Sequence, residues 1–216
     1  MRQWLVLVAL LFAVPAHGAH FESLGDLPGD RFESSALGIS ADGSTVVGTS
    51  VSASGNEAVR WTNSSGLVGL GTLPNGAFPT TAQGVSADGS VVVGFVTATS
   101  SLGIGKAFRW TSADGMVGLR DPITGQEIDD TGAAGVSADG SAVVGNTIGP
   151  SGARAFRWTS GDGMVDLGAL AIDQDGFGWS EGFGISADGS VVVGSVGSPA
   201  QPGIVIDPVI GPKARL

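Results

Sequence analysis

The 216-residue sequence contains no cysteine and no tyrosine, and its only histidines are His17 and His20. Without cysteine no disulfide can form, so the fold has to be stabilised by packing alone. Ser-His-Asp and Cys-His nucleophiles, and zinc sites made of Cys and His, need residues that the rest of the chain lacks. No Gly-rich phosphate-binding motif occurs either. The sequence therefore excludes these activities.

Charged residues are also few, at 14% of the sequence, and acidic residues dominate them. The formal net charge is -10 and the sequence pI is about 4.3. A negative surface potential disfavours nucleic acid and anionic membranes as partners. After the first residues, no stretch is long and apolar enough for a membrane helix.

The N-terminus has the pattern of an export signal. Arg2 precedes the apolar run Trp4–Val14, and small residues follow it between Pro15 and Ala19. This pattern predicts a signal peptide over residues 1–19, with an uncleaved membrane anchor as the alternative. The mature protein is then expected to be secreted or at the cell surface, or alternatively periplasmic.

Glycine, valine and serine are frequent instead, and they recur in a repeat. The tract Gly38–Gly48 returns as Gly84–Gly94, Gly135–Gly145 and Gly184–Gly194. A second tract, Ala-Val/Phe-Arg-Trp-Thr, begins at residues 58, 107 and 155. Repeats of roughly 45 to 50 residues are typical of β-propeller blades.

Each unit reads as four short strands. In the second unit these are Gly84–Ser86, Val91–Val96, Ala107–Thr111 and Met116–Leu119, with Asp-Gly turns inside the two hairpins. The prediction is an all-β, β-propeller-like array of four-stranded antiparallel blades. The domain is expected over residues 20–206, with units at about 36–71, 82–120, 133–168 and 182–206, and a C-terminal tail at 207–216.

The two ends of the array are out of phase with the repeat. Phe21–Gly29 resembles the end of the first unit, around Gly69–Gly76, and the fourth unit has only Ile204–Pro208 in place of its aromatic tract. Three blades are therefore complete and the fourth is partial. Either the N-terminal strand completes the fourth blade and closes a ring, or the chain is a fragment of an open array.

Side-chain alternation along the third strand places Phe108 and Trp110 on one face, where they are expected to fill the gap between blades. The arginine between them lies on the other face. We hypothesise that this arginine forms a repeated ion pair with the turn aspartate, through Arg60, Arg109 and Arg157 with Asp42, Asp88 and Asp139.

The Ser-x-Asp-Gly turn, the Val-Val-Gly strand, the Ala-Phe-Arg-Trp strand and the Leu-Gly-x-Leu ending resemble the HAF family of bacterial extracellular repeats. The similarity runs from about Phe21 to Gly194. The resemblance implies export and a β-propeller-like fold, often at the cell surface, and it implies no known activity.

The recurring turn aspartate has three readings: a calcium ligand, the Asp box of sialidases, or a residue that bonds its own turn. The Asp box requires a different glycine position and a tryptophan, so the turn reading is favoured. Asp173 and Asp175 form only a fragment of a calcium loop and are weak candidates for Ca²⁺ binding. No other metal or cofactor is expected.

Variable connections on a rigid scaffold are where binding usually occurs. The candidate partner-binding residues all lie in or beside the connections between units: Phe78, Asp121, Glu127, Asp129, Asp130, Trp179 and Glu181. Trp179 could stack on a sugar ring or a partner side chain, or simply pack over a blade edge.

The sequence thus predicts a non-catalytic binding or scaffold module whose partner is a protein or glycan at the cell envelope. One alternative is a structural or matrix component without a specific ligand. The other is a polysaccharide hydrolase that uses two carboxylates, drawn from Glu127, Asp129, Asp130, Asp173, Asp175 and Glu181.

Overall fold

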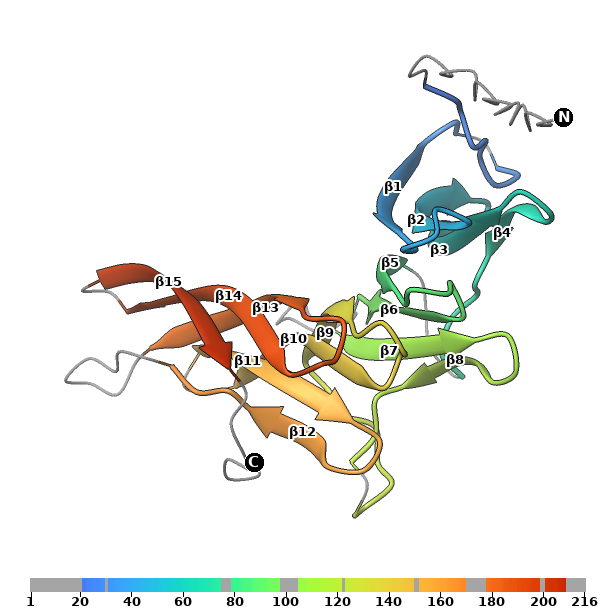
Figure 1. Ribbon diagram of the computed structural model, residues 1–216. Coiled ribbons are helices and arrows are strands. Elements are labelled where there is room, and N and C mark those ends of the chain that lie inside the picture. Colours follow the sequence, from blue (N-terminus) through green and yellow to red (C-terminus); the bar gives the residue numbers. More distant parts are fainter. Residues whose placement is uncertain are drawn as a thin grey trace, which may run out of the picture.

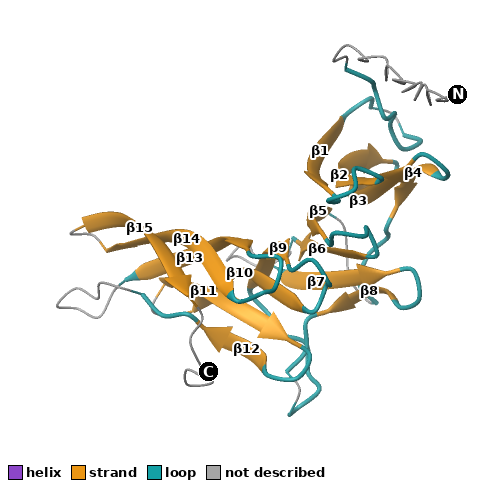
Figure 2. Cartoon of the chain, viewed as in Figure 1, coloured by secondary structure: helices purple, strands orange, loops and turns teal. Residues whose placement is uncertain are grey.

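The computed structural model describes residues 21–29, 31–74, 79–97, 105–121, 123–149, 152–169, 178–198 and 201–208, the last range by its backbone only. Every regular element within these ranges is a strand (Figure 2). No helix in the described part of the chain is long and apolar enough to cross a membrane. The prediction of an all-β chain is confirmed.

The fifteen strands of the described ranges form four antiparallel sheets in chain order. The first contains β1 (Ser34–Ile39), β2 (Thr45–Ser52), β3 (Gly55–Thr62) and β4 (Gly66–Gly69). The second contains β5 (Thr80–Val85), β6 (Val91–Val96), β7 (Lys106–Thr111) and β8 (Gly115–Gly118). The third contains β9 (Thr131–Val136), β10 (Ala142–Gly149), β11 (Gly152–Thr159) and β12 (Gly163–Asp166), and the fourth β13 (Trp179–Ile185), β14 (Val191–Ser198) and β15 (Gln201–Pro208).

The first strand of each following sheet packs on the second strand of the sheet before it, so that β5 contacts β2, β9 contacts β6, and β13 contacts β10. The first and fourth sheets lie at opposite ends of this array (Figure 1). The N-terminal segment lies against the first sheet, where the Leu27 N–H donates to Ser50 Oγ at 3.0 Å. Among the described residues the N-terminal segment does not complete the fourth sheet, and the four sheets form an open array whose fourth sheet has three strands.

The turn between the first and second strands is built by its own side chains. In the first sheet, Asp42 Oδ1 accepts from the Ser44 N–H at 2.9 Å, and Gly43 follows with a φ of 72°. Ser40 Oγ donates to the same carboxylate at 2.6 Å and accepts from the Thr45 N–H at 3.0 Å. The same bonds recur in the other three sheets. The turn reading of the aspartate is confirmed.

The glycine of the Val-Val-Gly tract marks a close approach between strands. A Cβ added at Gly145 would lie 1.9 Å from the Gly132 carbonyl oxygen on β9. The equivalent distance is also 1.9 Å at Gly48, Gly94 and Gly194. At each of these places the pairing of the first two strands shifts register. A β-bulge therefore presses a carbonyl group onto the neighbouring strand, and only glycine leaves room for it.

The core lies between successive sheets. One buried cluster joins Val47 of the first sheet to Val92 and Phe108 of the second. A second cluster joins Val93 of the second sheet to Phe156 and other residues of the third. Phe108 and Phe156 are 0% exposed. The prediction that the aromatic tract fills the gap between blades is confirmed.

The hypothesis of a repeated Arg–Asp ion pair is wrong. Arg60 donates through Nε to the Gly89 carbonyl of the next sheet at 3.3 Å, and Arg157 donates in the same way to Gly189 at 2.9 Å. Arg60 and Arg157 face the following sheet, whereas the aspartate of each one's own sheet is bonded by two serines. These two arginines therefore join neighbouring sheets through a carbonyl group.

Candidate binding face

In a four-stranded meander, the connection between the second and third strands and the connection to the next sheet emerge at the same end. We call this end the loop face. Its best described long connection runs from β8 to β9, over residues 119–130 except residue 122. The two hairpin turns of each sheet lie at the opposite end.

The β8–β9 connection contains a small hairpin. The Asp121 N–H donates to the Gln126 carbonyl at 2.9 Å, and an antiparallel bridge joins Arg120 to Glu127. Asp121 Oδ1 accepts from the N–H groups of Ile123 and Thr124, both at 2.8 Å. These bonds fix the tip of the hairpin, where Ile123 is 72% exposed.

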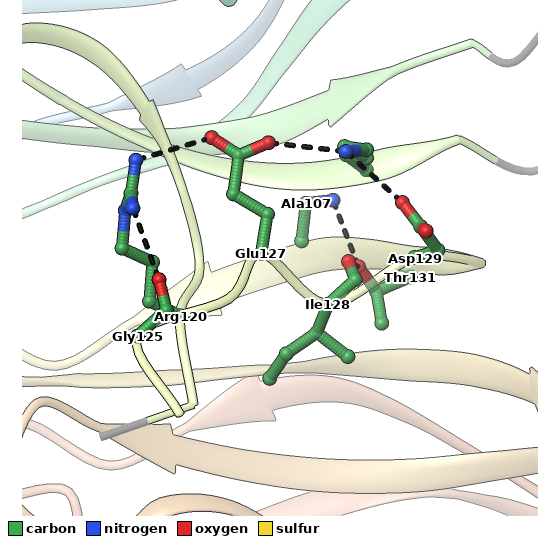
Figure 3. A network of polar contacts seen from close by, with 8 residues as sticks. Ala107, Arg120, Gly125, Glu127, Ile128, Asp129 and Thr131 are labelled. Atoms are coloured by element: carbon green, nitrogen blue, oxygen red, sulfur yellow. Dashed lines mark hydrogen bonds and ion pairs between the residues drawn. The ribbon is translucent and has the colours of Figure 1, made fainter. Parts of the chain in front are cut away.

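Two cations brace this hairpin through Glu127 (Figure 3). Lys106 Nζ lies 3.1 Å from Glu127 Oε2 and 3.1 Å from Asp129 Oδ1, and Arg120 Nη2 lies 3.4 Å from Glu127 Oε1. Hydrogen bonds to Asp129 and then to Glu127 raise the pKa of Lys106. Partly exposed ion pairs contribute only about 0 to 1 kcal/mol each, so the network orients the loop more than it stabilises the fold.

The hairpin is also anchored from the third sheet. Trp158, which is 8% exposed, donates through Nε1 to the Arg120 carbonyl at 2.9 Å. Arg120 itself donates through Nη1 to the Gly125 carbonyl at 3.0 Å. The hairpin thus has fixed contacts on both the second and the third sheet.

Asp130 ends this connection in an unusual backbone conformation. Its φ is 51°, the only positive value at a non-glycine residue in the described ranges. Aspartate tolerates this region better than most residues, because its short polar side chain can bond locally. Its carbonyl accepts from the Ile148 N–H at 2.8 Å, which fixes the connection to β10 just before β9 begins.

The fold thus brings Asp121, Glu127, Asp129 and Asp130 together in one connection. Trp179 and Glu181 lie apart from them, on β13. Trp179 is half-buried over the neighbouring strand, since a Cβ added at Gly197 would lie 2.5 Å from its indole ring. Phe78, Asp173 and Asp175 lie outside the described residues.

The described residues include no group of three or more acidic residues or histidines arranged to hold a metal ion. The turn aspartates instead accept hydrogen bonds from the serines of their own turns. The bond from the Ser40 hydroxyl, followed by those from Ser44, lowers the pKa of Asp42 from 3.8 to about 2. The corresponding serines lower the pKa of the other three turn aspartates to about 2 as well, namely Asp88, Asp139 and Asp188.

Sequence reasoning missed one repeated position beside the loop face, directly before the alanine of the third strand. There Glu57 accepts from the Gly71 N–H at 3.1 Å, Lys106 binds Glu127 and Asp129, and Arg154 donates to the Gly178 carbonyl. In each case a long charged side chain holds the connection that leaves its own sheet. The signal was available in the sequence, since all three repeats carry such a residue one place before Ala58, Ala107 and Ala155.

No protein-family model matches the chain, and no curated protein is similar to it in sequence. Its fold is similar to TolB from Acinetobacter baumannii, with a TM-score of 0.55 and 15% identity over 82% of this chain and 41% of that chain. A putative TolB from Agrobacterium tumefaciens gives a TM-score of 0.50 and 16% identity, covering 73% of this chain and 52% of that chain. A nidogen/laminin complex gives a TM-score of 0.46 and 13% identity, covering 79% and 64%.

The two TolB structures establish the β-propeller type of fold, as the sequence predicted. The chain spans less than two thirds of the length of each of these solved structures. Neither the family comparison nor the sequence comparison supports the HAF resemblance itself.

Proposed function

We propose that this chain is an exported, non-catalytic binding module of the HAF type, which binds a protein partner at its loop face. The observation that carries this proposal is the hairpin at residues 120–127. It presents the exposed Ile123 on a tip that is held by hydrogen bonds, two ion-paired cations and Trp158.

A fixed apolar tip suits recognition because little conformational entropy is lost when a partner covers it. The surrounding charges would form the polar rim that is typical of a protein interface. The net charge of -10 argues for a partner that is neither nucleic acid nor an anionic membrane.

The chemistry of the loop face argues against hydrolysis. Both oxygens of Glu127 are bound by cations, and Asp129 shares one of these cations. Such carboxylates are poorly placed to exchange protons with a substrate. The chain from residue 21 onward also has no histidine and no cysteine to act in their place.

Export rests on the sequence of residues 1–19 and would deliver the module to the periplasm, the cell surface or the medium. N-terminal sequencing of the protein after secretion tests this part separately. A mature N-terminus at or next to residue 20 is expected, and an intact Met1 in the cell-associated protein would contradict it.

Site-specific photocrosslinking tests the loop face. A photoreactive amino acid at Ile123, in cells that produce the protein naturally, should give a discrete crosslinked product. The matched control places the same group at Asp114, in a hairpin turn of the second sheet at the opposite end. Equal labelling from both positions, or none from Ile123, would overturn the proposal.

A second variant tests whether the bracing matters. Lys106→Gln removes both ion pairs of Lys106 and leaves the buried core untouched. Crosslinking from Ile123 should fall several-fold while the circular dichroism spectrum stays unchanged. Full retention of crosslinking would contradict the role of the rigid tip.

A further inference from the structure

The contact between successive sheets is a single junction that the chain repeats three times. At its centre, the N–H of the turn alanine in one sheet donates to the carbonyl of the equivalent alanine in the next. The distances are 3.1 Å from Ala41 to Ala87, 3.0 Å from Ala87 to Ala138, and 2.9 Å from Ala138 to Ala187.

Two further contacts recur at each junction. The turn glycine of the following sheet packs on the first residue of the second strand, and a Cβ added at Gly89 would lie 2.2 Å from the Thr45 side chain. A hydroxyl at the start of the following sheet also accepts from a backbone N–H of the third strand. The pairs are Ala58 to Thr80 at 2.8 Å, Ala107 to Thr131 at 2.9 Å, and Ala155 to Ser180 at 2.9 Å.

The first sheet has the same surface by which the later sheets pack on the sheet before them, but no described sheet covers it. No atom outside its own turn lies within 4 Å of a Cβ added at Gly43, whereas Gly89, its equivalent, is buried. Ile39 is 64% exposed, while the equivalent Val85 packs on the preceding sheet. Ser34 Oγ donates to Gly25 at 3.1 Å, as Thr80 does to Gly71 at 3.3 Å, but accepts no strand N–H in the described part of the chain.

The fourth sheet has the surface that a following sheet covers in the other three, and no described sheet covers it. Val193 is 43% exposed, whereas Val47, Val93 and Val144 at the same position are no more than 1% exposed. The Ala187 N–H has no acceptor in the next turn, because no further sheet follows it among the described residues. The exposed surface of the fourth sheet is therefore complementary to that of the first sheet, because the same two surfaces meet at each inner junction.

The N-terminal segment adds a second match. Phe21–Gly25 corresponds to the end of β4 and the residues after it, and Leu24 and Gly25 correspond to Leu70 and Gly71. This segment borders a groove of about 240 Å³ on the first sheet, lined by Val46, Val59 and Trp61 among others. The fourth sheet has three described strands, and none of them is the strand that this segment resembles.

We infer that the fourth sheet of one copy docks head to tail on the first sheet of a second copy. The docked fourth sheet fills the groove and repeats the junction, and the N-terminal segment of the second copy lies beside β15, at the position that the fourth strand has in the other three sheets. A heterologous contact of this kind closes a ring when the rotation permits it. A ring of two copies would hold eight blades, within the range of about four to eight that propellers use.

Sedimentation of two complementary variants tests this inference. Ile39→Asp disables the first sheet and Val193→Asp disables the fourth. Both residues are exposed, so each variant should keep the wild-type circular dichroism spectrum. Each variant alone should sediment as a monomer, because every contact would then include a disabled face. The wild-type chain should sediment as a dimer.

Mixing is the decisive measurement. Equal amounts of the two variants should form a one-to-one heterodimer, since the mixture retains one intact pair of faces. Val68→Asp is the matched control, because Val68 is also 43% exposed but lies on β4, and it should dimerise like the wild type.

A wild-type chain that is monomeric at all concentrations would overturn the inference. So would a dimer that survives Val193→Asp but not Ile39→Asp, because this result indicates two first sheets in contact with each other. These outcomes are independent of crosslinking from Ile123, since the loop face lies on the connections between sheets and not on the ends of the array.

Discussion

Val93 and Val193 occupy the same position in two repeats, and both lie on the second strand of a sheet with the same turn before it. Val93 is 0% exposed, and Val193 is 43% exposed. The difference comes entirely from the neighbour, because the third sheet covers Val93 and no described sheet covers Val193. A single blade therefore forms its strands locally but buries its apolar face only by stacking.

The largest expected effect lies inside a sheet and should be the same in every blade. Gly145→Ala would place a methyl group 1.9 Å from the Gly132 carbonyl, and a clash with backbone cannot relax by a rotamer change. The free energy of unfolding should fall by about 3 kcal/mol or more. Chemical denaturation measures it.

The control is Gly149→Ala on the same strand, where no atom lies within 4 Å of the added Cβ. This variant should change stability by no more than about 0.5 kcal/mol. Similar losses for both variants would show that the bulge contact is not what requires glycine at Gly145.

The difference between Val93 and Val193 predicts a smaller loss of stability than that expected for Gly145→Ala. Val93→Ala should cost about 2 to 3 kcal/mol, because the side chain is fully buried between two sheets. Val193→Ala should cost less than about 1 kcal/mol at dilutions where the chain is monomeric. Equal costs would mean that another part of the chain covers Val193 in solution.

The hydroxyl between sheets provides a polar version of the same test. Thr131→Val keeps the shape of the side chain but leaves the Ala107 N–H unpaired in a buried junction, so it should cost about 1 to 3 kcal/mol. Ser34→Ala, at the equivalent place on the first sheet, should cost no more than about 0.5 kcal/mol in the monomer. A large loss for Ser34→Ala at those dilutions would contradict an open first sheet.

The smallest effect concerns the turns, which should not distinguish inner from end blades. The folded chain lowers the pKa of Asp88 and its three equivalents from 3.8 to about 2 through bonds from the neighbouring serines. A lowered pKa in the folded state means that the contribution to stability is complete above about pH 4 and is lost as the pH falls towards 2. Acid denaturation followed by fluorescence measures this loss.

Asp88→Asn should flatten the decline of stability between pH 4 and pH 2, and Asp42→Asn should flatten it to the same extent. A much weaker effect at Asp42 than at Asp88 would show that the turns depend on their neighbouring sheet.

Much of the fold could be predicted because its signals are short. The Ser-x-Asp-Gly turn closes within five residues, and the strands Val91–Val96 and Ala107–Thr111 were expected within a residue or two of β6 and β7. The bulge between Ala82 and Gly84, opposite Gly94, was not predicted, since it depends on how the first strand pairs across the turn.

The candidate site was only partly predictable. The sequence indicated Asp121, Glu127, Asp129 and Asp130 as one variable connection, but did not indicate Lys106 and Arg120 as the cations that fix it. Nor did it predict that Trp158 would anchor Arg120, because these residues lie 38 positions apart. Such contacts need the relative placement of two sheets.

The sequence alone determined that the chain is an array of β blades, since the repeat, the turns and the strand patterns all act over a few residues. It also determined that His- and Cys-based chemistry is absent after residue 20. Only the tertiary structure decided that Arg60 and Arg157 bond the next sheet rather than their own aspartate, and that the first and fourth sheets lie apart. Those outcomes depend on contacts between sheets, which join residues about 30 positions apart and cannot be read from a short stretch of sequence.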